Sequence, residues 1–224
     1  MRYGDAAINA CAHGHRHTLA LTAWHHATIA AYGAAVTHRE PPDYAEFSPG
    51  YRPDLAVEGG GRGGELLLLD TKVGSPYVTS LTAEERHRST YVPFAGTAER
   101  HTTAVLGRAQ RGEPGDGPHV FADGSGYVSP KKADYHGALQ RAVEVRPIIH
   151  ETYGGLHRTA SRTLREMAGV YATRLAGSAG GRRAGTFRRF HRQRISCALA
   201  KGLAFELRHG ARVLRARATP GGCA

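Results

Sequence analysis

Cysteine is scarce in this chain, which has three in 224 residues. They are Cys11, Cys197 and Cys223, an odd and scattered set that does not resemble a disulfide framework. We therefore expect a reducing, intracellular compartment, with the nucleus as one option. No apolar run approaches the length of a membrane span, and the first residues lack the apolar core of a signal peptide. These absences argue against a membrane partner and against a small disulfide-rich secreted domain.

Acidic residues are also few relative to basic ones. Lys and Arg number 30 and Asp and Glu 19, so the formal net charge is +11. Such an excess favours a polyanionic partner such as nucleic acid. The accompanying excess of alanine and glycine is also typical of a GC-rich genome, which enriches arginine for other reasons. The charge therefore supports nucleic-acid binding without establishing it.

Hydrophobic periodicity and chain breakers predict an α/β domain with a mixed sheet. The helical stripes end at glycines, and the strands are cut by proline or glycine. In chain order we expect a helix at 17–32, a strand at 35–40, strands at 52–57 and 66–73, a helix at 131–142, a strand at 143–149 ending before His150, and helices at 159–175 and 190–207.

One domain, residues 17–209, accounts for these elements. We expect residues 1–16 to be a flexible His-rich start and residues 210–224 to be a frayed tail. Residues 107–130 are rich in Gly, Pro and Asp and predict a mobile insertion. We also expect the chain to be part of a longer reading frame.

The most informative residues follow four consecutive leucines, residues 66–69, which predict a buried strand. Asp70 and Lys72 come directly after these leucines, separated by Thr71. Because side chains alternate along a strand, Asp70 and Lys72 share a face, about 6–7 Å apart along it. Unpaired buried charge is costly, so we expect a compensating group at this position.

A second strand carries Asp54 in the sequence Arg52-Pro53-Asp54, and a Gly-rich connection joins it to the leucine strand. Their pairing would bring together two carboxylates and an ammonium, a set suited to a divalent metal and a phosphodiester. Two plainer interpretations stay open. Asp70 and Lys72 are also consistent with a simple ion pair at a strand end. Asp54 is also consistent with a turn residue after proline.

Asp54, the Gly-rich connection and Asp70-Thr71-Lys72 resemble the PD-(D/E)XK nuclease superfamily, and Pro53-Asp54 supplies its literal Pro-Asp pair. The resemblance implies a restriction-endonuclease-like mixed β-sheet flanked by helices. It also implies catalysis by Asp54, Asp70, Lys72 and Glu40. Mg²⁺ or Mn²⁺ would be bound by Asp54, Asp70, the Thr71 backbone carbonyl and Glu40. Lys72 would orient or deprotonate the attacking water, or stabilise charge on the phosphate.

The order of landmarks is more narrowly similar to the nuclease-like domain at the C-terminal end of some eukaryotic retroelement reverse-transcriptase reading frames. Its upstream Cys/His cluster is incomplete here. The counterparts are Cys11 and His13, Arg16-His17, Gly33, Glu40-Pro41, Arg52-Pro53-Asp54, Asp70-Thr71-Lys72 with Pro76, Pro147 with Glu151 to Gly154, and the segment from Phe190 to Ser196.

Several candidate residues have a plain structural alternative. Glu40 is equally consistent with a metal ligand and with a surface residue, and His17 is more typical of a helix start than of catalysis. Only one cysteine, Cys11, lies near the histidines of residues 13–26. This group therefore lacks the paired spacing of a zinc site. Glu151 is equally consistent with a family motif and with a strand-to-helix turn. Cys197 is predicted to lie on the apolar side of its helix, in the core.

A basic stretch near the C-terminus interleaves arginine with Phe187 and Phe190. Guanidinium groups suit phosphates, and the alternative is a solvated helix face. The main hypothesis is a metal-dependent nuclease acting on DNA, with RNA left open. The alternatives are an inactive nucleic-acid-binding module of a retroelement polyprotein, or a structural or interaction domain of it. The predicted nucleic-acid-binding residues are Arg182, Arg183, Arg188, Arg189, Arg192 and Arg194.

Overall fold

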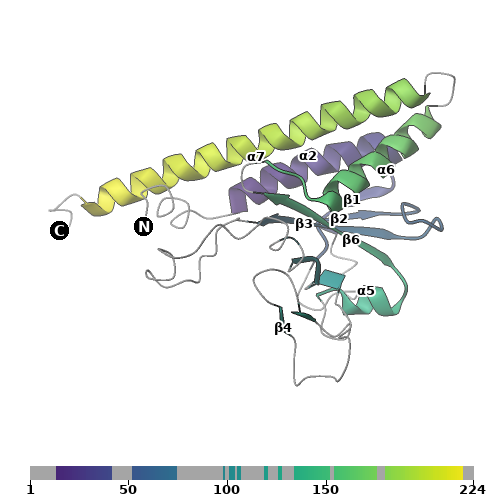
Figure 1. Cartoon of the computed structure of the whole chain (residues 1–224), viewed down its shortest axis with the longest axis horizontal. Helices are drawn as coiled ribbons and strands as arrows, with labels where there is room; N and C mark the ends of the chain where they lie inside the picture. The colour runs from purple at the N-terminus through teal and green to yellow at the C-terminus, as the bar shows by residue number, and fades with distance from the viewer. Residues whose placement is uncertain are drawn as a thin grey trace.

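A computed structural model describes residues 14–41, 52–74, 98, 101–103, 105–106, 119–120, 126–127, 134–151, 154–175 and 180–218. The predicted α/β class with a mixed sheet is confirmed (Figure 1). The elements are α2 (Gly14–Tyr32), β1 (Thr37–Arg39), β2 (Leu55–Val57), β3 (Leu67–Gly74), β4 (His119–Val120), β5 (Gly126–Tyr127), α5 (His136–Gln140), β6 (Glu144–Glu151), α6 (Arg158–Arg174) and α7 (Gly180–Ala218).

The main sheet has four strands in the order β1-β2-β3-β6. β2 is antiparallel to both β1 and β3, whereas β6 runs parallel to β3. Leu55 of β2 pairs with Leu69 of β3, so Asp54 comes one residue before that pair and Asp70 one residue after it. Opposed residues of an antiparallel pair share a face, and this register therefore directs Asp54 and Asp70 to the same side of the sheet.

Strand β3 is central, which explains its unbroken apolar sequence. Leu67 and Leu69 face a core formed with α2, α6 and α7, while Leu68 faces a smaller core that includes Tyr135 and Val145. Figure 1 shows the three long helices together on one side of the sheet and α5 on the other. A strand covered on both faces needs apolar residues at every position, as the four leucines indicate.

Helices α2 and α7 are joined by a buried ion pair near the start of α2. Arg16 Nη2 lies 2.9 Å from Glu206 Oε2, and the Arg16 backbone N–H donates to Glu206 Oε1 at 3.2 Å. Both side chains are buried. The helices approach closely here, because a Cβ added to Gly202 would lie 2.7 Å from Arg16 Cα. Removing one partner of such a buried pair typically costs several kcal/mol, so this contact fixes the alignment of α7 on α2.

The last helix is much longer than predicted. It begins at Gly180 and continues to Ala218, so the expected helix bounds at 190 and 207 were wrong, as was the expected frayed tail as far as residue 218. Tertiary packing explains the difference. Phe187, His191, Ile195 and Leu199 form a buried stripe at four-residue spacing, and this packing outweighs the glycines in the first turns.

The bounds of other helices and strands also differ from those predicted. β6 includes His150 and Glu151 rather than breaking there, because it pairs with β3 as far as Gly74. α2 begins at Gly14, so residues 14–16 do not belong to a flexible start, and α5 is shorter than the predicted 131–142. Cys197 is exposed, not in the core, because α7 turns its buried stripe to α2 and α6.

The expected insertion at 107–130 lies outside the described residues except for β4 and β5, which pair with each other. Within the described part of the chain, none of the helices combines the length and hydrophobicity needed to span a bilayer.

One buried histidine links the sheet to α2. Trp24 Nε1–H donates to His150 Nε2 at 2.7 Å, and neither side chain is exposed. Because indole only donates, Nε2 must be unprotonated and the neutral ring carries its hydrogen on Nδ1. Burial, and to a smaller extent the charge of His17, lowers the pKa of His150 to about 3.

This histidine makes folding stability depend on pH. The unfolded chain takes up the proton near pH 6.5 and the folded chain only near pH 3, so stability falls as pH drops below 6.5. From this residue we expect a loss of about 2 kcal/mol between pH 6.5 and 5. His150→Gln retains an acceptor for Trp24 without titrating. Urea unfolding at pH 7 and pH 5 should show a clearly smaller pH-dependent loss in that variant, and an equal loss would contradict this account.

Candidate functional site

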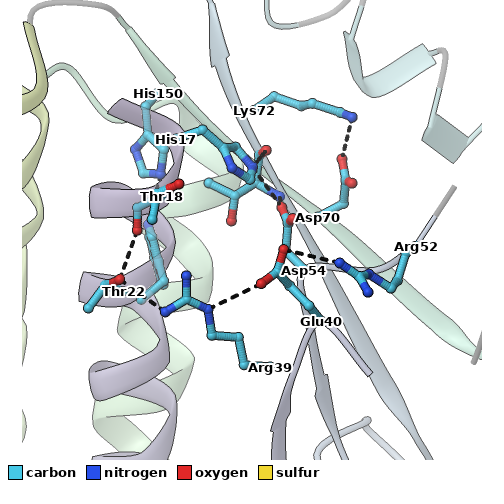
Figure 2. Close-up of polar contacts among 12 residues, drawn as sticks. His17, Thr18, Thr22, Arg39, Glu40, Arg52, Asp54, Asp70, Lys72 and His150 are labelled. Atoms are coloured by element: carbon cyan, nitrogen blue, oxygen red, sulfur yellow. Dashed lines mark hydrogen bonds and ion pairs between the residues drawn. The ribbon is translucent and has the colours of Figure 1, made fainter. Parts of the chain in front are cut away.

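Asp70 is a buried carboxylate at the end of the apolar part of β3. It is only 4% exposed. Tyr135 O–H donates to Asp70 Oδ1 at 2.8 Å, whereas buried Oδ2 accepts no hydrogen bond. Lys72 Nζ lies 3.3 Å from Oδ2, an ion-pair distance without the direction of a hydrogen bond (Figure 2). Oδ2 is thus a buried carboxyl oxygen with hydrogen-bonding capacity left over.

The surroundings of Asp70 oppose its ionised form. Burial raises its pKa above the usual range and is the strongest effect. Lys72 acts in the opposite direction, while the neighbouring Asp54 charge raises the pKa further. Two carboxylates in partly dry surroundings repel each other, and a bound cation relieves that repulsion.

Asp54 is fixed by the backbone of β3. Its Oδ2 accepts a 2.5 Å hydrogen bond from the Thr71 N–H, and its backbone carbonyl accepts from the Glu40 N–H at 2.8 Å. Asp54 is also buried. The carboxylate therefore stands against β3 directly beside Asp70, as the sequence predicted from the two strands.

His17, in the first turns of α2, contacts the same Asp54 oxygen as the Thr71 N–H. Its Nε2 lies 3.2 Å from Asp54 Oδ2 and 3.1 Å from the Thr71 carbonyl oxygen (Figure 2). Both partners are acceptors, so Nε2 carries a hydrogen. The hydrogen bond to Asp54 is the main reason that the pKa of His17 is raised, against the opposing effect of burial. The Thr71 carbonyl, predicted as a metal ligand, accepts a hydrogen bond from this imidazole.

Glu40 does not join the carboxylate pair. Its carboxylate lies 3.5 Å from Arg39 Nε and 3.4 Å from Arg52 Nη2 (Figure 2). Among the residues that the structure describes, no group of three or more His, Cys, Asp or Glu side chains is arranged to hold a metal ion. Glu40 therefore does not complete the predicted set of metal ligands, because its carboxylate is paired with Arg39 and Arg52 instead.

The predicted nucleic-acid-binding arginines lie on α7. The described side chains of this group are exposed to solvent, while that of Arg182 lies outside the described residues. Two of them make local contacts. Arg183 donates to the Leu175 carbonyl at 2.8 Å, and Arg194 Nη2 lies 2.5 Å from His26 Nδ1. The exposed members are Arg183, Arg188, Arg189, Arg192 and Arg194.

Sequence reasoning missed the role of Tyr135. The sequence placed it only within the helix expected at 131–142, yet Tyr135 precedes α5 and its hydroxyl donates to Asp70. A tyrosine in an apolar stripe is the one available signal, because a buried hydroxyl needs a partner. The partner lies 65 residues away in sequence, so no local pattern identifies it.

Comparison with known proteins finds no matching family model, no similar curated protein and no similar solved structure.

The hydrogen bond between Tyr135 and Asp70 can be measured by a double-mutant cycle. Tyr135→Phe keeps the ring and removes the donor, so we expect the free energy of unfolding to fall by about 1.5–3 kcal/mol at pH 7. In an Asp70→Ala background, which removes the acceptor, the same change should cost less than half as much. Urea unfolding of the four proteins gives the coupling, and equal costs in both backgrounds would show that the hydroxyl does not act on Asp70.

Proposed function

We propose that this chain is a metal-dependent nuclease that hydrolyses DNA phosphodiester bonds, with a restriction-endonuclease-like fold. One observation carries the proposal: the buried Asp70 carboxylate has an oxygen that accepts no hydrogen bond, and it lies beside both Asp54 and Lys72. A merely structural ion pair would gain more from a fully hydrogen-bonded carboxylate, since each unsatisfied buried oxygen costs free energy.

The two carboxylates fit a hard divalent cation such as Mg²⁺ or Mn²⁺, which prefers oxygen ligands. Asp54 and Asp70 would bind it. The Thr71 carbonyl oxygen accepts a hydrogen bond from His17 and would join them through its second lone pair. When bound, the ion polarises the phosphate and lowers the pKa of a water molecule. The cation would also remove the penalty that the fold imposes on two adjacent carboxylates.

The side chains at the rim have separate tasks. Lys72 is about one-third exposed (31%), so its ammonium can turn from Asp70 to donate hydrogen bonds to a phosphate oxygen as negative charge develops there. Tyr135 fixes the orientation of Asp70 through Oδ1 and leaves Oδ2 directed to the site. His17 holds Asp54 and offers an N–H donor at the edge of the carboxylate pair.

The exposed arginines of α7 supply contacts to the phosphate backbone without reading sequence. This agrees with the net charge of +11 and with a DNA or RNA partner. A retroelement polyprotein is the proposed context, in an intracellular compartment with the nucleus as one option.

A second candidate function is a nucleic-acid-binding module that lacks catalysis. One observation favours it: Glu40 is paired with arginines rather than with the aspartates. Such a module would bind DNA equally well with and without a divalent cation. An interaction domain, the third possibility, would show little affinity for DNA.

Cleavage of supercoiled plasmid and of single-stranded DNA with Mg²⁺ or Mn²⁺ tests the proposal. We expect Asp70→Asn to reduce the rate at least 100-fold, because it removes a ligand charge, and Lys72→Gln to reduce it at least 10-fold. The matched control is Glu58→Gln, which alters an exposed carboxylate that lies close to His38 at the end of β2.

Glu58→Gln should cleave at the wild-type rate. Absence of cleavage by the wild type, with DNA binding retained, would favour the inactive module. Equal rates in wild type, Asp70→Asn and Lys72→Gln would assign the activity to another site or to a contaminant.

A further inference from the structure

Two arginines from different elements approach the middle of α2. Arg194 of α7 has its Nη2 2.5 Å from His26 Nδ1. Arg39 of β1 donates from Nη1 to Thr22 Oγ1 at 3.1 Å (Figure 2). Thr22 and His26 are four residues apart in α2, and residues at that spacing are neighbours on a helix surface. The two guanidinium groups therefore lie within about one helical turn of the same imidazole.

Three histidines lie together with these arginines. The His25 and His26 rings are stacked, with centroids 6.4 Å apart, and both side chains are half-exposed. His191 lies one turn before Arg194 in α7 and is buried, and its Nδ1 has no hydrogen-bond partner among the described residues. We call this group the arginine–histidine cluster, which consists of Arg39, Arg194, His25, His26 and His191.

The contact between Arg194 and His26 defines the protonation state of that ring. A guanidinium group only donates hydrogen bonds, so His26 Nδ1 is the acceptor. The neutral ring therefore carries its hydrogen on Nε2. A proton added at Nδ1 would set two donors against each other at hydrogen-bond distance, unless an acceptor came between them.

The arginine charges keep the imidazoles of the cluster neutral. Burial, followed by the charges of Arg39 and His26, lowers the pKa of His25. Burial, Arg194 and Arg39 lower the pKa of His26. Burial, with smaller effects of Arg194 and His26, lowers the pKa of His191 to about 4. Among the described residues, no carboxylate raises the pKa of any of these three rings, so no acidic group offsets the positive charge around them.

One carboxylate adjoins the cluster at its β1 end. Glu40 follows Arg39 and lies 3.5 Å from its Nε, but the same carboxylate is also paired with Arg52. A single carboxylate between two arginines leaves positive charge over. Like charges that the fold holds together cost free energy, and a bound anion would recover it. A phosphate group suits this position, because guanidinium and imidazole N–H groups both donate to its oxygens.

We propose that Arg194, Arg39 and His26 form a binding site for a phosphate group, and that His26 is protonated when the site is filled. A phosphate oxygen between Arg194 and His26 accepts a hydrogen bond from each, in place of their direct contact. The group belongs either to a nucleic-acid backbone or to a free phosphate, which offer the same chemistry. The inference goes beyond the proposed nuclease function, because it needs neither the carboxylate pair nor a metal.

Sulfate tests the site, because it has the shape of phosphate and does not titrate near neutral pH. The pH titration of His26 is followed in the full chain by NMR of ¹³C-labelled histidine, and His26→Asn identifies its signal. Spectra are compared in about 50 mM sodium sulfate and about 150 mM NaCl, which match in ionic strength. We expect sulfate to raise the pKa of His26 by at least about 0.5, equivalent to about threefold tighter binding to the protonated ring.

Two variants and a matched control locate this effect. Arg194→Gln removes the guanidinium that contacts His26, so the pKa of His26 should rise in chloride and the shift caused by sulfate should fall below half. Arg194→Lys keeps the charge and should retain most of the shift, which separates lost binding from misfolding. The control, Arg188→Gln, removes an exposed arginine of α7 whose charge does not act on His26, and should titrate as wild type does.

An unchanged pKa of His26 in sulfate, or equal shifts in wild type and Arg194→Gln, would overturn the inference. An equal loss of the shift in Arg188→Gln would overturn it as well, because the effect would then come from overall charge rather than from a site.

The source of the phosphate group is identified by replacing sulfate with a short single-stranded DNA, with EDTA present to prevent cleavage. A shift of the His26 pKa at micromolar DNA supports a nucleic-acid backbone as the occupant. A shift with sulfate and inorganic phosphate alone supports a free phosphate. A protein that shows the shift but never cleaves DNA would contradict the nuclease proposal and leave this site assigned.

Discussion

Pairing of β3 on both edges is the constraint from which the candidate site follows. β2 on one side brings Asp54 to Asp70, and β6 on the other side makes β3 an interior strand. A carboxylate at the end of such a strand adjoins an apolar core and is shielded from water. Ionising this carboxylate therefore costs free energy, and the surrounding groups offset part of that cost.

These groups come from distant parts of the chain. Tyr135 donates to one Asp70 oxygen, Lys72 approaches the other, and His17 reaches Asp54 from α2. His17 is placed by the first turns of α2, where Arg16 is tied to Glu206 of α7. The longest helix thus fixes the position of an imidazole at the site, although α7 itself contributes no residue to the carboxylate pair.

The sequence predicted the parts of this arrangement that depend on local pattern. Leu66 to Leu69 indicated a buried strand, and the Gly-rich connection indicated its pairing with the strand that carries Asp54. The length of α7 was not predictable, because its early glycines disfavour helix and tertiary packing, such as that of Phe187 against Tyr171, compensates them. His150 was expected to end its strand, but pairing with Val73 extends it.

The residues that would bind a metal were harder to predict, because they too depend on tertiary contacts rather than on local pattern. The partners of Glu40 are decided by the positions of Arg39 and Arg52, and the partner of the Thr71 carbonyl is decided by an imidazole 54 residues earlier. Contacts of this kind have no periodic signal in sequence. Residue types at the end of a strand therefore indicated a class of chemistry, while geometry determined which residues take part.

We propose that Asp54 and Asp70 together bind a divalent cation. The most direct test is anomalous diffraction from crystals of the full chain soaked in Mn²⁺. We expect an anomalous peak within bonding distance of carboxylate oxygens of both aspartates, and its disappearance in Asp70→Asn crystals. Well-ordered aspartates without a peak, at Mn²⁺ concentrations that saturate other Mn²⁺ enzymes, would contradict it.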